Sequence, residues 1–356
     1  LEPVQRPVAL KLIRPGMDSR EVLARFEAER QVLARMDHPH IARVFDAGAT
    51  EDGRPYFAME FVDGLPLNRY CDDNGLGLQA RIDLFMQVCE GVQHAHHRGI
   101  IHRDLKPTNI LVTTTDGRPA PKIIDFGIAR TMEPAVNGMT ALTGLDRMIG
   151  TPEYMSPEQA GLTGEEVDTR TDVYALGAML YELLVGELPF GGRELRQAGY
   201  DEVRRIIREV EPVRPSRRLN TLGDTVSSVA EPRQMEGDLD WIVMKSLDKE
   251  RDRRYGSPSE LAADLSRFLR DRPVEARPPS LNYRAGKFVR RHRIFVVAAA
   301  AVLLAIVTGV AVGAVGLVRA RAAEREARRE ALIAEDVTGF LVQLFQVSEP
   351  GEAAAN

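Results

Sequence analysis

One segment of the chain is an apolar run that is longer than a water-soluble fold usually exposes or buries. The run from Ile294 to Val318, IFVVAAAAVLLAIVTGVAVGAVGLV, carries no charged residue over about 25 positions, which is enough to cross a bilayer as one helix. A buried core helix is the alternative, but an uncharged run of about 18 or more residues favours a membrane span. A secretory signal is excluded, because the run lies far from the N-terminus. We therefore predict one transmembrane helix over 294–318.

The flanks of this run are basic on both sides, so the positive-inside rule gives no orientation. Lysine or arginine stands at 284, 287, 290, 291 and 293 before it, and arginine at 319, 321, 325, 328 and 329 after it. Upstream, the Pro- and Arg-rich stretch RPVEARPP at 272–279 is typical of a linker between a folded domain and the membrane. Downstream, residues 319–346 predict a charged helix that becomes amphipathic near its end.

The composition is that of an ordinary folded protein. The chain has 44% hydrophobic and 28% charged residues and a net charge of -5, so no basic excess indicates a nucleic-acid partner. Its two cysteines, Cys71 and Cys89, have neither disulfide-framework nor metal-ligand spacing, which fits a reducing compartment. The first residue is Leu1 rather than Met and no closing element precedes Asn356, so we expect a fragment of a longer protein.

Two short motifs carry the chemistry. HRDLKPTN occupies residues 102–109, and DFG occupies residues 125–127. Between them, the residue types follow the pattern strand, tight turn, strand, with Asp116 and Gly117 at the turn. DFG alone would be weak, because three letters recur by chance in surface turns. The two motifs joined by a predicted hairpin make a chance match negligible.

These motifs resemble the catalytic loop and the metal-binding loop of protein kinases. Phosphoryl transfer requires a group that orients a hydroxyl and charges that neutralise the γ-phosphate oxygens. The resemblance implies that Asp104 accepts the proton of the substrate hydroxyl and that Lys106 lies near the γ-phosphate. Asn109 and Asp125 offer the hard oxygen ligands that Mg²⁺ prefers. ATP and two Mg²⁺ ions are the implied cofactors.

Further positions match the family in order from Val8 to Leu269. The sequence VALK resembles the strand whose lysine contacts the α- and β-phosphates, which gives that role to Lys11. Its expected ion-pair partner is Glu29, because Glu29 shares one helical face with apolar residues three positions before and four positions after it. Glu27 is the competitor, but it falls off that face.

The sequence YFAMEFVDG resembles the last strand of the N-terminal lobe and the hinge. By this resemblance Met59 is the gatekeeper, and the backbones of Glu60 and Val62 bond the edge of the adenine. Ala9 and Leu111 would lie on the two faces of the ring. Plain core packing is the alternative for each of these residues, and only their register with the catalytic motifs favours nucleotide contact.

Other matches are structural. The sequence SPE at 156–158 stands where the family has Ala-Pro-Glu, and the resemblance pairs Glu158 with Arg254. Asp172 is expected to accept hydrogen bonds from the catalytic-loop backbone, because a buried carboxylate needs partners. Histidines at 94, 96 and 97 suggest a metal site, but they end a predicted helix without an accompanying acidic or cysteine ligand, so we reject that interpretation.

The glycine-rich loop of the family is missing, because residues 1–7 contain no glycine. That loop covers the ATP phosphates, so we expect nucleotide binding by this chain to be weakened. No Walker A motif replaces it, since the one Gly-Lys pair is followed by Phe288.

The predicted fold class is α+β: the two-lobed protein kinase fold with a truncated N-terminal lobe, followed by one transmembrane helix. DLDWIVMK and PVEARPP further resemble membrane-anchored bacterial kinases in which tetratricopeptide-type repeats follow the membrane helix. The predicted divisions are a partial N-lobe at 1–63, a C-lobe at 64–271, a juxtamembrane linker at 272–293, the span at 294–318 and the start of a C-terminal helical region at 319–356.

The resemblance implies a serine/threonine protein kinase whose partners are protein substrates, the membrane and a second copy for autophosphorylation, with no nucleic acid. Lys106 favours Ser/Thr over Tyr, as does Thr151, which in the family contacts the catalytic aspartate and lysine. Because the chemistry needs ATP, residues 1–293 are expected in the cytoplasm. A pseudokinase scaffold is one rival, opposed by the intact catalytic residues, and a membrane anchor for an assembly platform is another.

Activity is expected to be switched on by phosphorylation of the segment between Asp125 and Glu158. Arg103, directly before the catalytic aspartate, places a cation close to the active site, with which a phosphate of about −2 charge can pair bidentately. Residues 131–147 are rich in Thr, Gly and Met and follow neither periodicity. Thr143 lies eight residues before Thr151, a spacing that resembles the autophosphorylated position of related bacterial kinases, and Thr140 is the second candidate. Ordinary polar loop residues are the alternative.

Overall fold

The chain divides into two compact units, Leu1–Lys287 and Phe288–Asn356. The predicted residues Glu29, Thr140, Thr143 and Thr151 lie outside the part that the structure, a computed structural model, describes. The described residues are 6–12, 33, 36–126, 152–161, 167–222, 232–278 and 280–347.

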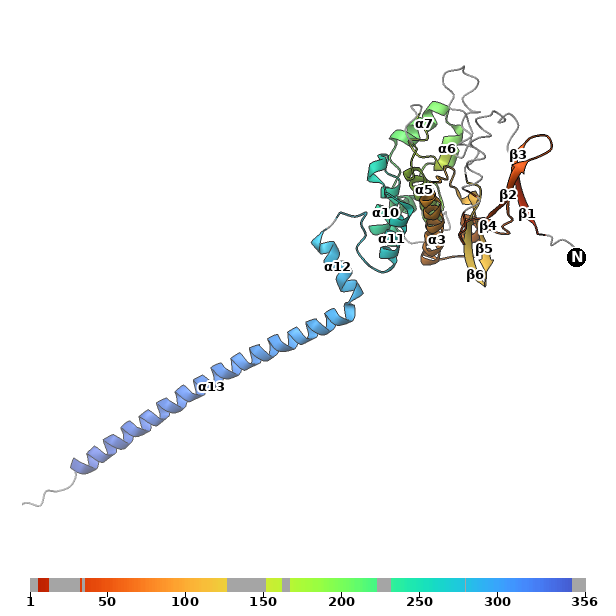
Figure 1. Cartoon of the computed structure of the whole chain (residues 1–356). Helices are drawn as coiled ribbons and strands as arrows, with labels where there is room; N and C mark the ends of the chain where they lie inside the picture. Colours follow the sequence, from red (N-terminus) through yellow and green to blue (C-terminus); the bar gives the residue numbers. More distant parts are fainter. Residues whose placement is uncertain are drawn as a thin grey trace, which may run out of the picture. The chain divides into compact units, whose positions relative to one another are not determined.

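A three-stranded antiparallel sheet begins the first unit (Figure 1). β1 (Val8–Leu12) pairs with β3 (Pro55–Glu60), and β3 pairs on its other side with β2 (Val44–Ala49). Exposure alternates along β1, so Lys11 lies on its less exposed face. Phe57 at the centre of β3 is fully buried. The sheet therefore presents Lys11 from β1, which is paired with the core-anchored β3.

A second antiparallel sheet contains the predicted hairpin. β5 (Ile110–Thr115) pairs with β6 (Arg118–Ile123) on one side and with the short β4 (Leu65–Pro66) on the other. The two turn residues, Asp116 and Gly117, have φ values of 50° and 74°, as a tight type I′ hairpin requires. The sequence prediction of strand, tight turn, strand is confirmed, and the hairpin connects the two chemical motifs.

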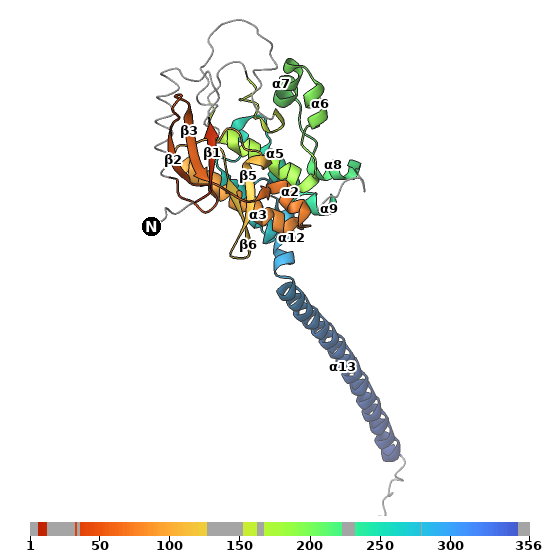
Figure 2. The same ribbon diagram turned by 90° about the vertical axis from the view of Figure 1, so that its right-hand side faces the viewer.

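Helices predominate in the rest of the first unit that the structure describes, and they surround α5 (Arg170–Val185), most of whose residues are buried. α3 (Leu78–His97) packs against α5 and β6, while α10 (Asp238–Ser246) and α11 (Pro258–Leu269) pack against α5 and each other. Figures 1 and 2 show β5 and β6 beside α3. The smaller helices are α2 (Leu67–Asp73), α6 (Gly192–Gln197), α7 (Tyr200–Glu209), α8 (Pro215–Leu222) and α9 (Pro232–Met235).

After α11 the chain stays on the first unit. Val274 is only 4% exposed, and a further helix, α12 (Leu281–Arg291), contains the buried Lys287. Much of the stretch expected as a juxtamembrane linker therefore makes ordered contacts before the second unit begins at Phe288.

The second unit consists of one long helix in its described part. α13 runs from Arg293 to Val347, so the charged helix predicted downstream of the apolar run is continuous with it. Among the described residues it is the one helix long and apolar enough to cross a membrane, and none of its most apolar stretch is buried.

Candidate active site

One buried carboxylate binds the backbone of the catalytic loop. Asp172, fully buried in α5, accepts hydrogen bonds from the backbone N–H groups of His102 and Arg103, each at 2.8 Å. Burial acts to raise the pKa of Asp172, but hydrogen bonds from His96 and His102 outweigh it and hold that pKa below its usual range. The role expected for Asp172 is confirmed.

Two residues of the site have unusual backbone conformations. Arg103 has a φ of 64° and Asp125 a φ of 62°, a left-handed region that residues other than glycine rarely adopt. Strain of this kind collects at functional sites where surrounding contacts fix the chain. Here the buried His102 supplies one such contact, because its ring packs against Phe126 at a centroid distance of 4.8 Å. The two motifs are therefore locked together.

Asp104, Lys106 and Asn109 form one hydrogen-bonded group. Lys106 Nζ lies 2.8 Å from Asp104 Oδ2, and Asn109 Nδ2 donates to the Asp104 carbonyl oxygen at 2.8 Å. Because the amide nitrogen of Asn109 faces Asp104, its side-chain oxygen is the atom that can serve a cation. The side chains of Asp104 and Lys106 are each 22% exposed, so a substrate hydroxyl can reach them.

Lys11 and Asp125 bring the first sheet to the second motif. The Lys11 ammonium is in contact with the Asp125 carboxylate. Burial lowers the pKa of Lys11, and the negative charge of Asp104 partly opposes this effect. Carboxylate and amide oxygens at Asp125 and Asn109 are the donor types that Mg²⁺ prefers, and an adjacent ammonium suits the phosphates that such an ion would carry. The residues present therefore fit a magnesium nucleotide.

The expected hinge is fastened at Glu60. Its backbone N–H donates to the Arg43 carbonyl at 2.8 Å, and its carboxylate lies 2.8 Å from Lys122 Nζ. Lys122 belongs to β6, so this ion pair connects the two sheets. Of the other predicted adenine contacts, Ala9 lies opposite Met59 in the register of β1 and β3, Leu111 lies in β5 and Val62 follows β3. Contact of these residues with adenine stays a prediction.

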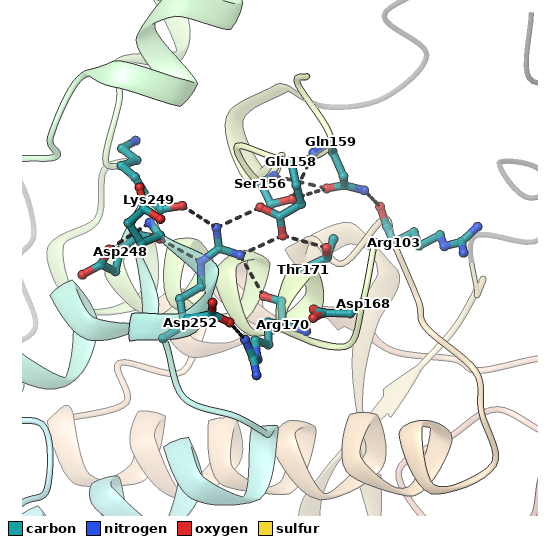
Figure 3. Close-up of polar contacts among 12 residues, drawn as sticks. Arg103, Ser156, Glu158, Gln159, Asp168, Arg170, Thr171, Asp248, Lys249 and Asp252 are labelled. Carbon is teal, nitrogen blue, oxygen red and sulfur yellow. Dashed lines mark hydrogen bonds and ion pairs between the residues drawn. The ribbon is translucent and has the colours of Figure 1, made fainter. Parts of the chain in front are cut away.

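A pocket opens between the catalytic loop and the segment 152–161. Gln159 connects its two walls, because its Nε2 donates to the Arg103 carbonyl at 2.8 Å and its Oε1 accepts from the Ser156 amide at 3.1 Å (Figure 3). The lining residues are Arg103, Asp104, Leu105, Lys106, Tyr154, Met155 and Gln159.

Comparison with known proteins identifies this arrangement. The protein kinase domain matches residues 2–265 of the chain. The chain belongs to the protein kinase family. Serine/threonine-protein kinase PknB of Mycobacterium leprae is 38% identical over 278 residues, which cover 77% of this chain and 40% of that protein. PknB of Mycobacterium tuberculosis is 37% identical over the same length. The chain thus spans about two fifths of the length of these curated relatives.

A solved kinase structure is similar as well. The crystal structure of the M. tuberculosis PknI kinase domain matches with a TM-score of 0.53 and 26% sequence identity, and the match covers 74% of this chain and 85% of that one. The predicted kinase fold is confirmed.

In this kinase a buried ion pair supports the pocket wall. Both terminal nitrogens of Arg254 donate to the Glu158 carboxylate at 2.8 Å. The Thr171 hydroxyl donates to the same carboxylate at 2.8 Å (Figure 3). The side chains of Arg254 and Glu158 are 0% and 4% exposed. The predicted pairing of Glu158 with Arg254 is confirmed.

The histidines at the end of α3 require one correction. His96 does have an acidic partner, because its Nε2 lies 2.7 Å from Asp172 Oδ2. The statement that no acidic residue accompanies these histidines was wrong, since the partner is 76 residues away in sequence. Gln159 and Lys122 were also missed, because nothing in their sequence neighbourhood marks the residues they contact.

Proposed function

We propose that the chain is the catalytic part of a serine/threonine protein kinase that transfers the γ-phosphate of ATP to hydroxyl groups of proteins. The observation that carries the proposal is that the residues of both motifs lie together. Lys106 and Asn109 are hydrogen-bonded to Asp104, and Lys11 is in contact with Asp125. Names of relatives at 37% and 38% identity support the choice of Ser/Thr.

Each residue has a role in the proposed reaction. Asp104 orients the substrate hydroxyl and accepts its proton as the oxygen attacks the γ-phosphorus. Lys106 supplies positive charge where it develops on the transferred group. Lys11 pairs with the α- and β-phosphates. Asn109 and Asp125 would hold Mg²⁺, which supplies charge that neutralises the phosphate oxygens.

We further propose that the kinase is anchored in a membrane by residues 294–318, with residues 1–293 in the cytoplasm. The exposure and apolar character of this part of α13 support a span, and the need for ATP supports the orientation. The likeness of DLDWIVMK and PVEARPP to bacterial kinases with tetratricopeptide-type repeats supports membership of that group.

Phosphorylation of Thr143, with Thr140 as the second site, is proposed to activate the enzyme, and two copies of the chain would supply it to each other. Arg103 lies in the catalytic loop beside the pocket. A phosphate on Thr143 or Thr140 could bind Arg103 and so order the segment that also contains Thr151. Full-length protein with both Thr140 and Thr143 changed to Ala should lose turnover on an external substrate. Wild-type turnover in that variant would refute this mechanism.

Transfer of radiolabelled phosphate by the full-length protein tests the main proposal. Asp104→Asn should lower the rate by about 10²- to 10⁴-fold, as loss of a general base does. Asp201→Asn, at a side chain that is 95% exposed, is the matched control and should keep the wild-type rate. Label found mainly on phosphotyrosine would contradict the Ser/Thr assignment, and a wild type that binds ATP without transfer would favour the pseudokinase.

A further inference from the structure

Two buried carboxylates hold the segment that precedes the second unit. Asp264 of α11, which is 0% exposed, accepts hydrogen bonds from the backbone N–H groups of Glu275 and Ala276, both at 2.8 Å. Asp238, the first residue of α10, lies 2.7 Å from Lys287 Nζ. We call residues 273–278 and 280–287 the strap, because carboxylates of these two helices hold them on the first unit.

The strap has its own internal contacts. The backbone N–H of Val274 donates to the Tyr283 hydroxyl at 2.9 Å, and the Arg277 guanidinium lies 4.4 Å from the centre of the Tyr283 ring. The same guanidinium is 3.5 Å from Asp238. Lys287 is only 8% exposed, and a lysine is rarely buried unless it is paired. Undocking would therefore leave Asp238 and Asp264 without partners that they have in the docked state.

Asp264 also connects the strap to the active site. Its Oδ2 accepts a hydrogen bond from the Tyr255 hydroxyl at 2.9 Å. Tyr255 directly follows Arg254, whose guanidinium holds Glu158. The neighbouring Gln159 bonds the backbone of the catalytic loop. Polar contacts thus connect the strap amides to Arg103 through two pairs of sequence neighbours, Tyr255 with Arg254 and Glu158 with Gln159.

We propose that the strap is a coupling element that must be docked for full turnover. Docked, it completes the hydrogen bonds of Asp264 and so fixes the Tyr255–Arg254 segment that supports the pocket wall. Released, it loosens that support and lowers the rate of transfer. Since the strap leads into the predicted membrane helix, a pull or rotation of that helix would change the activity of the kinase. The link to turnover rests on the proposed function.

The experiment compares Lys287→Met with Arg291→Met in the full-length protein, reconstituted in lipid nanodiscs. Arg291 is exposed and lies one helical turn beyond Lys287, so it is a matched control. Hydrogen–deuterium exchange measures docking of the strap, and steady-state kinetics measures turnover. We expect Lys287→Met to increase exchange over 272–287 and to lower kcat by about fivefold or more, the lower end of typical coupling. The KM for ATP should be unchanged, and Arg291→Met should match the wild type in both assays.

A second variant separates coupling from loss of folding. In Asp238→Asn/Lys287→Met the buried charge is removed with its partner, so the lobe should stay folded while the strap is released. Fast exchange with low kcat supports the proposal. Fast exchange with wild-type kcat overturns the coupling, and unchanged exchange overturns the docking role of Lys287. If the wild-type protein transfers no phosphate although its strap is protected from exchange, the proposed function fails while the docked strap remains.

Discussion

At the scale of single residues, the ion pair of Arg254 and Glu158 shows how burial and charge act together. Burial alone would raise the pKa of Glu158, but the hydrogen bonds and charge of Arg254 hold that pKa below its usual value of 4.5. The pair therefore contributes stability that is fully present above pH 4.5 and is lost as the pH falls through the lower folded-state pKa.

Changing Arg254 to Met should lower the free energy of unfolding by about 3–5 kcal/mol, because it leaves a buried carboxylate without its main partner. Urea denaturation followed by circular dichroism measures this change. The control is Asp252→Asn, which removes an 82% exposed partner of Arg170 and should cost less than about 1 kcal/mol. Equal losses in the two variants would contradict the assignment.

His38 predicts a second pH dependence. Burial, together with the neighbouring His94 and His40, lowers the pKa of His38 from 6.5 to about 4. The unfolded chain then binds a proton between these pH values that the folded chain does not, so stability is full above pH 6.5 and falls towards pH 4. His38→Gln should flatten this decline in the urea midpoint, whereas the exposed His97→Gln should leave it as in the wild type. Parallel curves for all three proteins would count against a role of His38.

The sequence could predict the site residues that belong to recognisable local motifs. Asp104, Lys106, Asn109 and Asp125 stand in short motifs with a hairpin between them, and Lys11 stands in a strand with a recognisable register. Other contacts of the site join side chains that are distant in sequence. Gln159 meets Arg103 across 56 residues, and such a contact follows only from the packed lobe.

At the scale of elements, the contact between α5 and α10 depends on a glycine. A Cβ added at Gly177 would lie 2.6 Å from the Cβ of Ser246 and 3.2 Å from its carbonyl carbon. Both distances are shorter than ordinary van der Waals contacts, so an alanine at position 177 does not fit unless one helix moves. The close approach brings α10 against the helix that carries Asp172.

Gly177→Ala should therefore lower the free energy of unfolding by about 1–3 kcal/mol through overpacking, although alanine is the better helix former by about 1 kcal/mol. Gly286→Ala in α12 is the matched control, because nothing lies within 4 Å of its added Cβ. There the helix propensity should act alone and leave stability unchanged or slightly higher. Thermal unfolding measures the sign of the stability change in each variant. A Gly177→Ala variant more stable than the wild type would contradict the prediction.

Elements, like residues, could be predicted where the sequence carries a local signal and could not be predicted where their order depends on distant contacts. The hairpin of β5 and β6 has a local signal in its turn residues, and it was predicted. The strap has no such signal, since Pro- and Arg-rich composition is typical of linkers, and its order comes from Asp238 and Asp264 on other helices. The family resemblance gave the lobes, whereas the contacts after α11 became visible only in the structure.

At the scale of the whole molecule, the proposed orientation can be measured on intact cells. Basic residues on both sides of the apolar run do not choose between orientations, so the requirement for ATP decides. An external protease should cut the tail after residue 318 and leave the kinase domain intact, and permeabilised cells should lose both. Cleavage of the kinase domain with a protected tail would reverse the assignment.

The length of α13 determines what the membrane can influence. Its 55 residues rise about 1.5 Å each, and with 294–318 in the bilayer the remaining residues to 347 form up to about 40 Å of helix beyond it. Electrostatic screening at physiological salt acts over about 8 Å. On the proposed span, Arg319 and Arg321 would lie within the field of the lipid headgroups, whereas Glu335 and Asp336 would lie far outside it. A change in lipid charge would act on the first turns of this helix and leave its far end unaffected.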